Sequence, residues 1–213
     1  MIQKFKNSKI QIHYIKCIYL SISIILCLAS CRGRADHLTV SDDVSSDTSM
    51  VEFARGFSME THGEITLLTV SNPWQGAQNV VYRYALCPKG MDVPSEYSQY
   101  TVIHTPVERV ICLSTTHVAM LSSLGHASSI IALSGTFVSD STIKKAIEEG
   151  QTVDIGYEHG LNFERIISLR PDVIFAYGVD GGLTGSLARL EGLGQKIVFV
   201  AEYLERTALG KAE

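Results

Sequence analysis

The sequence lacks the surplus of basic residues that a nucleic-acid-binding protein needs. It holds 18 Lys and Arg against 22 Asp and Glu, and four of the lysines fall within residues 1–30, where no acidic residue occurs. The remainder therefore has 14 basic against 22 acidic residues, a formal charge of −8. Nucleic acid binding depends on basic patches that neutralise phosphates. We expect no nucleic acid partner.

The short motifs of common enzymes and metal sites are also missing. The chain has no Gly-x-Ser-x-Gly, no His-Glu-x-x-His and no Walker A loop. Beyond residue 52 the histidines are scattered, with no pair at metal-ligand spacing: His62, His104, His117, His126 and His159. Composition leaves a Ser/His/Asp triad possible, but no Ser has the local motif of a nucleophile. We expect no catalytic residue, no resident metal and no cofactor.

The chain has no apolar run of the roughly 20 residues that a membrane-spanning helix requires. Residues 17–29 form a shorter run behind a lysine-bearing start, which is typical of an export signal. The run ends in Leu28-Ala29-Ser30-Cys31, which resembles the bacterial lipoprotein box, in which the Cys is lipidated. We expect a signal peptide over residues 1–30 and a lipid on Cys31 that holds the protein at the periplasmic or outer face of a cell-envelope membrane. The alternative is an uncleaved anchor with an incidental Cys.

Beyond Cys31, only Cys87 and Cys112 remain, and neither belongs to a CxxC or other metal spacing. An exported protein could pair them. Because Cys112 lies inside an apolar run, where a buried thiol acts as a small hydrophobe, we favour two unpaired cysteines.

Residues 31–52 are rich in Ser and Asp and have no apolar period, so they predict a flexible tether. Residues 53–107 predict a β-hairpin extension. Its strands are the β-branched and aromatic runs 64–71 and 79–87, separated by the turn-rich residues 72–76. Residues 91–107 read as a connecting loop that contains a short extended piece at 100–103.

Residues 108–213 alternate apolar strands with helical patterns. The strands are predicted at 109–113, 129–133, 152–155, 172–177 and 196–201. Helix N-caps are predicted at Thr115 or Thr116 and at Asn162, and a further helix is predicted to start at Ser139 or Ser141. Such alternation predicts an α/β fold: a Rossmann-like, mainly parallel sheet of about five strands flanked by helices. Ligands of these sheets bind beyond the carboxyl ends of the strands. Here those ends lead into residues 114–117, 134–137, 156–160, 178–182 and 202–204.

The glycine-rich residues 178–185 follow a predicted strand and open a helix, and Glu202 ends the next strand. A nucleotide-binding α/β enzyme is therefore an alternative function. The spacing departs from G-x-G-x-x-G, however, and glycines that serve a tight strand-to-helix turn explain it better.

Three segments together resemble one protein family. They are Arg109-Val-Ile-Cys-Leu-Ser, the run from Asp154-Ile-Gly through Leu161-Asn-Phe-Glu-Arg-Ile-Ile-Ser-Leu-Arg-Pro-Asp-Val-Ile-Phe-Ala, and Leu193-Gly-Gln-Lys-Ile-Val-Phe-Val. They are similar to the helical-backbone periplasmic binding proteins that feed ABC importers of iron-siderophores, haem and vitamin B12. The resemblance implies a two-lobed protein with its ligand in the cleft between lobes. Residues 108–213 then correspond to the N-terminal lobe alone, and we expect weak or absent ligand affinity in this chain by itself.

The resemblance also implies roles for individual residues. Glu164 matches a surface carboxylate that docks on arginines of the ABC permease, although a first-turn Glu is also favoured by the helix dipole. The ligand-facing loops supply the expected binding residues: Ser114, Thr115, Thr116, His117, Tyr157, His159, Tyr177 and Gly178.

Several of these assignments have competing interpretations. His117 could instead be a solvent-exposed histidine at a helix start, and Tyr177 a packed residue at the edge of the core. Aromatic and His side chains suit a large planar or metal-chelate ligand, whether a siderophore, haem or a corrinoid. A surface adhesion or scaffold module that uses the predicted hairpin is a third possible function.

Overall fold

The computed structural model describes residues 51–157, 160–178 and 181–213, all of which fall within one compact unit, Val44–Glu213. The predicted signal peptide, Cys31, nearly all of the predicted tether and His159 lie outside the described residues. Among the helices that are described, none combines the length and hydropathy needed to cross a membrane.

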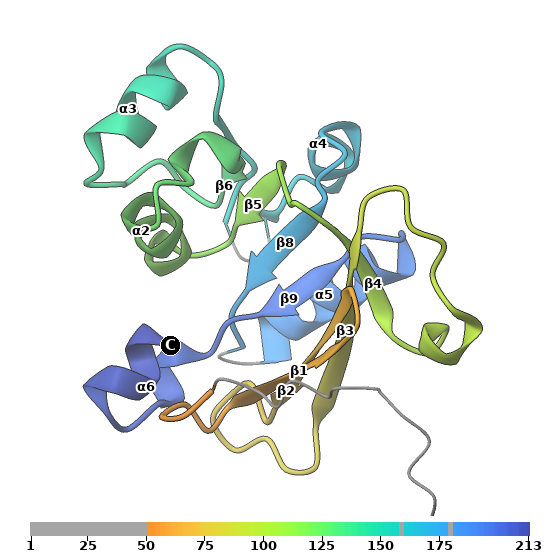
Figure 1. Ribbon diagram of the computed structural model, residues 1–213. Helices are drawn as coiled ribbons and strands as arrows, with labels where there is room; N and C mark the ends of the chain where they lie inside the picture. The colour runs from red at the N-terminus through yellow and green to blue at the C-terminus, as the bar shows by residue number, and fades with distance from the viewer. Residues whose placement is uncertain (1–50, 158–159, 179–180) are drawn as a thin grey trace, which may run out of the picture. The chain divides into compact units, whose positions relative to one another are not determined.

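A five-stranded parallel sheet forms the C-terminal part of this unit (Figure 1). Its strands are β5 (Val110–Cys112), β6 (Ile130–Leu133), β7 (Val153–Asp154), β8 (Val173–Ala176) and β9 (Ile197–Phe199), in the order β7-β6-β5-β8-β9. Every neighbouring pair is parallel. The predicted α/β class and its five strands are confirmed. Every residue of β5 and β9 is buried, as expected where helices cover both faces.

Four helices connect these strands: α2 (Thr115–Ser123), α3 (Ser141–Glu148), α4 (Phe163–Ser168) and α5 (Gly181–Gly192). The chain moves from β5 through α2 and α3 toward β7, and returns through α4 and α5 toward β9. Right-handed crossovers that run in opposite directions place the two helix pairs on opposite faces. Figure 1 shows α2 and α3 together on one side of the sheet. The direction of winding therefore switches between β5 and β8, where such folds bind ligands.

One of the three predicted helix starts needs correction. Helix α2 is capped by Ser114, whose hydroxyl oxygen accepts from the Thr116 amide, rather than by Thr115 or Thr116. Helix α3 begins at Ser141, one of the two predicted starts, and is capped by Asp140, whose carboxylate accepts from two first-turn amides. Both caps satisfy backbone donors that the first turn leaves without partners. The predicted cap of α4, Asn162, is confirmed, since its side-chain oxygen accepts from the Arg165 amide.

The N-terminal part forms a second sheet that is larger than the predicted hairpin. Strands β2 (Ile65–Ser71) and β3 (Val81–Pro88) are the antiparallel pair that the sequence predicts. They are joined by β1 (Phe57–His62), antiparallel to β2, and by β4 (Thr101–Thr105), parallel to β3. A short 3-10 helix, η1 (Ser95–Tyr97), lies between β3 and β4. Strand β1 is not predicted from the sequence, because its residues mix polar and apolar types and none is fully buried.

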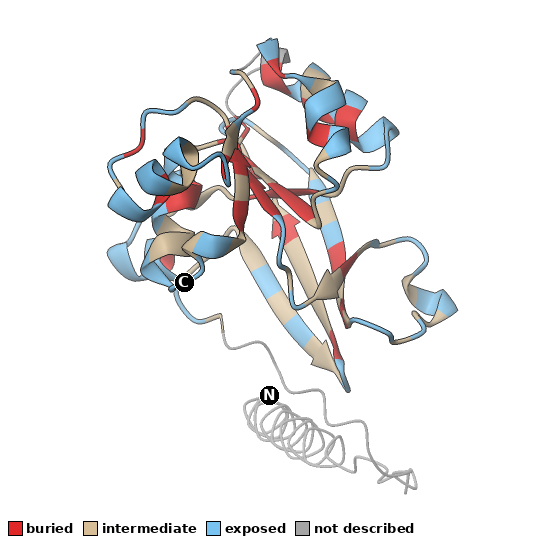
Figure 2. Ribbon diagram, turned by 90° about the horizontal axis from the view of Figure 1, so that it is seen from above, coloured by how far each residue is buried: buried red, intermediate tan, exposed pale blue. Residues whose placement is uncertain are grey.

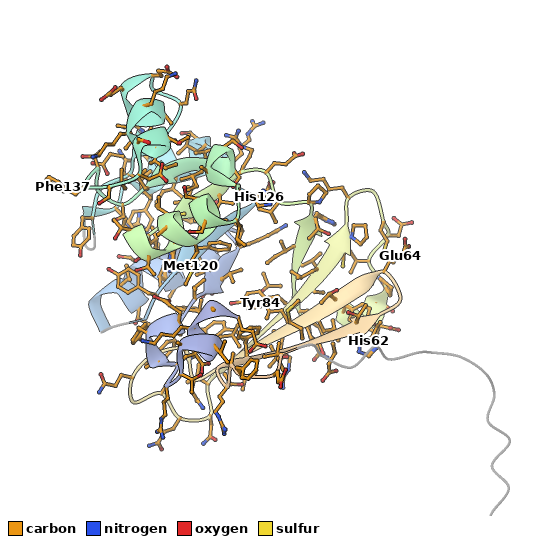
Figure 3. The ribbon with its side chains drawn as sticks, turned by 60° about the vertical axis from the view of Figure 1, so that its left-hand side comes forward. His62, Glu64, Tyr84, Met120, His126 and Phe137 are labelled. Atoms are coloured by element: carbon orange, nitrogen blue, oxygen red, sulfur yellow. The ribbon has the colours of Figure 1, made fainter. Side chains whose placement is uncertain are left out.

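The two sheets share one hydrophobic core. Val70, Tyr84 and Ile103 of the N-terminal sheet belong to the same buried cluster as the strands of the parallel sheet, where buried residues concentrate in Figure 2. Figure 3 shows Tyr84 between the sheets, and its hydroxyl accepts from the Phe199 amide of β9 at 3.4 Å. Trp74 packs against the Phe199 ring at 5.6 Å between centroids. The two sheets therefore support each other.

Cys87 and Cys112 are buried and free, so the expectation of two unpaired cysteines is confirmed. Burial raises the pKa of both thiols, that of Cys112 to about 12. Both are inert, uncharged core residues at physiological pH.

The last described residues form η4 (Glu202–Leu204) and α6 (Ala208–Ala212), where the sequence predicts the approach to another helix. Carboxylates of this segment bind the backbone of residues 52–56. Glu205 accepts from the amides of Arg55 and Gly56 at 2.8 and 2.7 Å. Glu213 accepts from those of Glu52, Phe53 and Ala54. The two ends of the described unit are thus held together.

Candidate functional site

A cavity of about 230 Å³ opens at the carboxyl edge of the parallel sheet. Its walls come from the segments that follow β5, β6, β7 and β8, so it lies across the point where the direction of winding switches. This is the position at which open α/β sheets bind ligands. The lining residues are Leu113, Ser114, Thr115, Ser134, Gly135, Phe137, Tyr157 and Tyr177.

Hydrogen bonds hold the loops around this cavity in fixed positions. The Ser134 hydroxyl donates to the Gly156 carbonyl at 2.8 Å and so joins the loops after β6 and β7. Asp154 Oδ1 accepts from the amides of Gly135 and Gly156 at 3.1 and 2.9 Å. Because neighbouring loops are bonded to each other, the cavity walls are organised before any ligand arrives.

The turn after β7 requires glycine at one position. Gly156 has φ of +84°, and a Cβ there would stand 2.2 Å from the Gly160 carbonyl oxygen. The Gly160 amide also donates to the Tyr157 carbonyl at 2.8 Å. This tight turn leaves Tyr157 exposed at the cavity rim, where its ring is 57% accessible.

Aromatic side chains surround the opening. Phe137, in the loop after β6, is 95% exposed, and Figure 3 shows it projecting at the periphery. With Tyr157 and Tyr177 it gives the cavity three rings from three different loops. Rings at a cavity mouth can stack on a planar or apolar partner. The hydroxyls of Ser114, Thr115 and Ser134 add neutral hydrogen-bonding groups.

His117 is neither on the cavity surface nor exposed to solvent, so the alternative of an exposed helix-start histidine is wrong. It is 1% exposed and lies edge-on to Phe175 and Tyr177, with ring centroids 6.1 and 6.3 Å away. Burial lowers its pKa to about 4, against a smaller opposing effect of a hydrogen bond with the Phe175 backbone. Its Nδ1 has no partner among the described residues. His117 is therefore a neutral ring behind Tyr177.

Two further predicted binding residues are also absent from the cavity wall. Thr116 donates its amide to the Ser114 cap and is exposed beside the cavity. Gly178 instead contacts Trp74, with which it forms a β-bridge, and a Cβ at Gly178 would stand 2.7 Å from the Trp74 ring. Its carbonyl accepts from the Tyr203 hydroxyl. Packing accounts for the glycine at position 178, so this residue lends no support to a nucleotide-binding turn.

Glu164 is exposed in the first turn of α4, directly after the loop that carries Tyr157. A carboxylate at this position is favoured by the dipole of the helix that it opens. It is accessible to a partner protein.

Sequence reasoning missed Ser134, Gly135 and Phe137 as individual residues, although it identified their loop as one that follows a strand end. No motif distinguishes a single Ser, Gly or Phe. Their signal is positional, because they follow the apolar run of β6. Among the residues that the structure describes, no cluster of three or more His, Cys, Asp or Glu side chains could hold a metal ion.

Comparison with solved structures finds distant similarity. A periplasmic vitamin B12 binding protein of Vibrio cholerae is 22% identical, with a TM-score of 0.32 over 44% of this chain and 34% of that one. A periplasmic heme binding protein of Pseudomonas aeruginosa is 21% identical, with a TM-score of 0.33 over 43% and 30%. An ABC-type Fe³⁺-hydroxamate transport system protein of Saccharomonospora viridis is 24% identical, with a TM-score of 0.33 over 48% and 36%.

Comparison of sequences finds similarity over part of the chain. An uncharacterized lipoprotein of Methanocaldococcus jannaschii is 34% identical over 122 residues, which are 54% of this chain and 29% of that protein. This chain thus spans less than a third of the length of that relative. Residues 110–203, which hold the whole parallel sheet and every residue of the cavity wall, match the family model described as periplasmic binding protein. Through this segment the chain is similar to the periplasmic binding protein family.

Proposed function

We propose that the protein is a substrate-binding lipoprotein of an ABC importer, which takes up an iron-siderophore, haem or cobalamin and delivers it to the permease. The observation that carries this proposal is the cavity at the switch point of the parallel sheet, within the segment that matches the family. The protein would act by binding and release, without covalent chemistry.

The cavity wall suits a large ligand with a flat or apolar surface. Phe137 and Tyr157 are exposed enough to lie against such a ligand, and the three hydroxyls can bond to its polar edge. The wall is open on one side, as in one half of a cleft. The resemblance to two-lobed binding proteins supports a second lobe, beyond the residues of this chain, as the opposite wall.

Two other surfaces would complete the function. Glu164 would dock on basic residues of the permease, because its carboxylate is exposed near the ligand edge of the lobe. Cys31 would hold the protein at the membrane through attached acyl chains; since one chain binds a membrane only marginally, firm anchoring takes more than one.

Ligand binding is tested by equilibrium dialysis of the full-length protein, including the second lobe that this proposal requires, against haem, cobalamin and a ferric hydroxamate siderophore, up to millimolar concentrations. We expect at least one ligand to bind, and Phe137→Ala with Tyr157→Ala together to weaken it about tenfold, from the loss of two stacking contacts. The control is Leu193→Ala, an exposed apolar residue that follows α5 and lies outside the cavity wall. If all three ligands fail to bind, the proposal is wrong.

Docking is tested by uptake into cells or vesicles that contain the cognate permease. Glu164→Lys should abolish uptake and leave ligand affinity unchanged, because the carboxylate is outside the cavity wall. The matched control is Glu148→Lys, another exposed helical carboxylate, on α3. Equal uptake by both variants would remove Glu164 from the proposed docking surface.

A further inference from the structure

Among the residues that the structure describes, the wall of the cavity carries no ionisable group other than tyrosine. Its eight residues supply aromatic rings, hydroxyls and backbone, with no Lys, Arg, Asp or Glu. The charged side chain bonded to this wall is acidic, since Asp154 Oδ1 accepts from the Gly135 amide. In sequence, the stretches 114–117, 134–137, 156–160, 178–182 and 202–204 hold no Lys or Arg and three acids: Glu158, Asp180 and Glu202.

Basic residues occur instead at the opposite edge of the sheet. Arg109 directly precedes β5 and Lys196 directly precedes β9, while Arg170 lies just ahead of β8. Because the strands are parallel, their amino ends share one edge. Arg109 Nη2 donates to the Leu169 carbonyl at 2.6 Å, which fixes that cation at the amino edge. Charge is thus segregated across the lobe, with cations away from the cavity.

An anionic ligand would find little compensation at such a site. A carboxylate or catecholate that leaves water needs a cation or several hydrogen-bond donors in exchange. The start of α2 is the one feature of the described wall that favours negative charge, and its Thr116 amide already donates to the Ser114 hydroxyl oxygen. A neutral or cationic ligand would incur no such penalty.

We infer that the ligand carries no net negative charge and is a neutral or cationic chelate or macrocycle with an apolar face. This inference rests on the proposed function and narrows it. It favours a neutral corrinoid or a cationic hydroxamate chelate over haem with free propionates and over anionic catecholate or carboxylate iron chelates.

The test is a dialysis panel with the full-length protein at low and high ionic strength. Probes are cyanocobalamin (neutral), ferrioxamine B (cationic), haemin (anionic) and a ferric tris-catecholate (strongly anionic). A neutral or cationic probe should bind at least about tenfold more tightly than either anion at low salt. Added salt should reduce the difference in affinity between the cationic and the anionic probes, because it screens their charges. Comparing the affinities for cyanocobalamin and ferrioxamine B distinguishes a neutral corrinoid ligand from a cationic hydroxamate chelate.

Charge variants locate the effect. Phe137→Lys places a cation at the cavity mouth and should shift the ratio of anion to cation affinity about threefold toward anions. Leu193→Lys makes the same change outside the cavity wall, next to the amino edge, and should leave the ratio unchanged. An anionic probe that binds as tightly as the others would overturn the charge preference alone. Binding of no probe would overturn both this inference and the proposed function.

Discussion

Tyr177 and His117 occupy the boundary between the cavity and the core. Tyr177 lines the cavity, and the His117 ring lies edge-on behind it. His117 has no solvent contact to stabilise a positive charge, and its other neighbour is the Phe175 ring. At the residue scale, therefore, the cavity wall is supported by a histidine that stays neutral.

The stability of the protein should depend on pH through His117. In the unfolded chain this histidine binds a proton below pH 6.5, whereas in the fold its pKa is about 4. The contribution of His117 to the free energy of unfolding should be fully present above pH 6.5. It should fall by about 3 kcal/mol as the pH falls to about 4, because the unfolded state binds more protons than the folded state in that range. Urea unfolding at a series of pH values measures this loss.

His117→Leu is the matched variant for this prediction, and its stability should change little between pH 6.5 and 4. Asp140 does not interfere in that window. The Ser122 hydroxyl and the Ile143 amide lower its pKa below 3.8, so its contribution is lost only at more acid pH. An unchanged pH slope in the leucine variant would show that the histidine is not responsible.

Gly178→Ala should destabilise the fold by about 1–3 kcal/mol, because its methyl group would overlap the Trp74 ring. Gly185→Ala is the control, since nothing lies within 4 Å of a Cβ there, and it should gain up to about 1 kcal/mol from helix propensity. Trp74 is the only tryptophan, so its fluorescence follows unfolding and also reports local displacement. Equal stability changes in the two variants would contradict this packing.

At the scale of elements, short contacts between distant segments complete the unit. The Asp172 carboxylate, just ahead of β8, accepts from the amides of Glu108 and Arg109 at 2.8 and 3.0 Å. This bond joins the start of β8 to the link between the two sheets. Glu205, after η4, binds the segment ahead of β1 in the same way. In each case a carboxylate satisfies backbone donors that no strand or helix pairs.

Glu205→Ala should loosen the segment ahead of β1 without unfolding the sheets. The amides of Arg55 and Gly56 lose their acceptor, so hydrogen exchange there should accelerate about tenfold. Exchange in β9 should not change. The comparison is Glu149→Ala, which removes an exposed i,i+4 pair with Lys145 on α3 and an exposed hydrogen bond from the Gln151 side chain. Unchanged exchange at residues 55 and 56 in Glu205→Ala would disprove the proposed role of this carboxylate.

At the scale of the whole described unit, the N-terminal sheet and the parallel sheet unfold as one body if their shared core is what stabilises them. Far-UV circular dichroism and Trp74 fluorescence should therefore give coincident urea transitions. Trp74 reports on the contact between the two sheets, because it belongs to the loop that connects β2 to β3 and its ring packs against Phe199 of β9. Two separate transitions would show that the sheets are independent domains.

Tyr84→Phe tests the same junction at one atom. The variant removes the hydroxyl that accepts from the buried Phe199 amide. It should lower the free energy of unfolding by about 1–2 kcal/mol, while urea unfolding stays a single cooperative transition. Tyr157→Phe removes an equivalent hydroxyl from an exposed ring at the cavity rim and should leave stability unchanged. No difference between the two variants would argue against the bond between the sheets.

Local patterns in the sequence were enough to predict the parallel α/β core and the edge at which its loops gather. Period, turn residues and the Asn162 cap are local signals, so they could be read before the chain was folded. The same local signals predicted the β2–β3 pair. They missed β1 and gave β4 only as a short extended piece at 100–103, because pairing with a neighbour, rather than the pattern of their own residues, makes these segments strands.

Tertiary structure alone decided which loop residues form the cavity. Ser114, Thr115, Tyr157 and Tyr177, which the resemblance suggests as ligand-binding residues, line it together with Ser134 and Phe137, which no motif marks. It also placed His117 in the core and Gly178 against Trp74, since both positions depend on residues distant in sequence. The same cause applies to each residue. A local sequence pattern predicts where a strand ends and at which edge of the sheet its loop lies. The burial of a side chain in that loop depends on side chains from segments distant in the sequence.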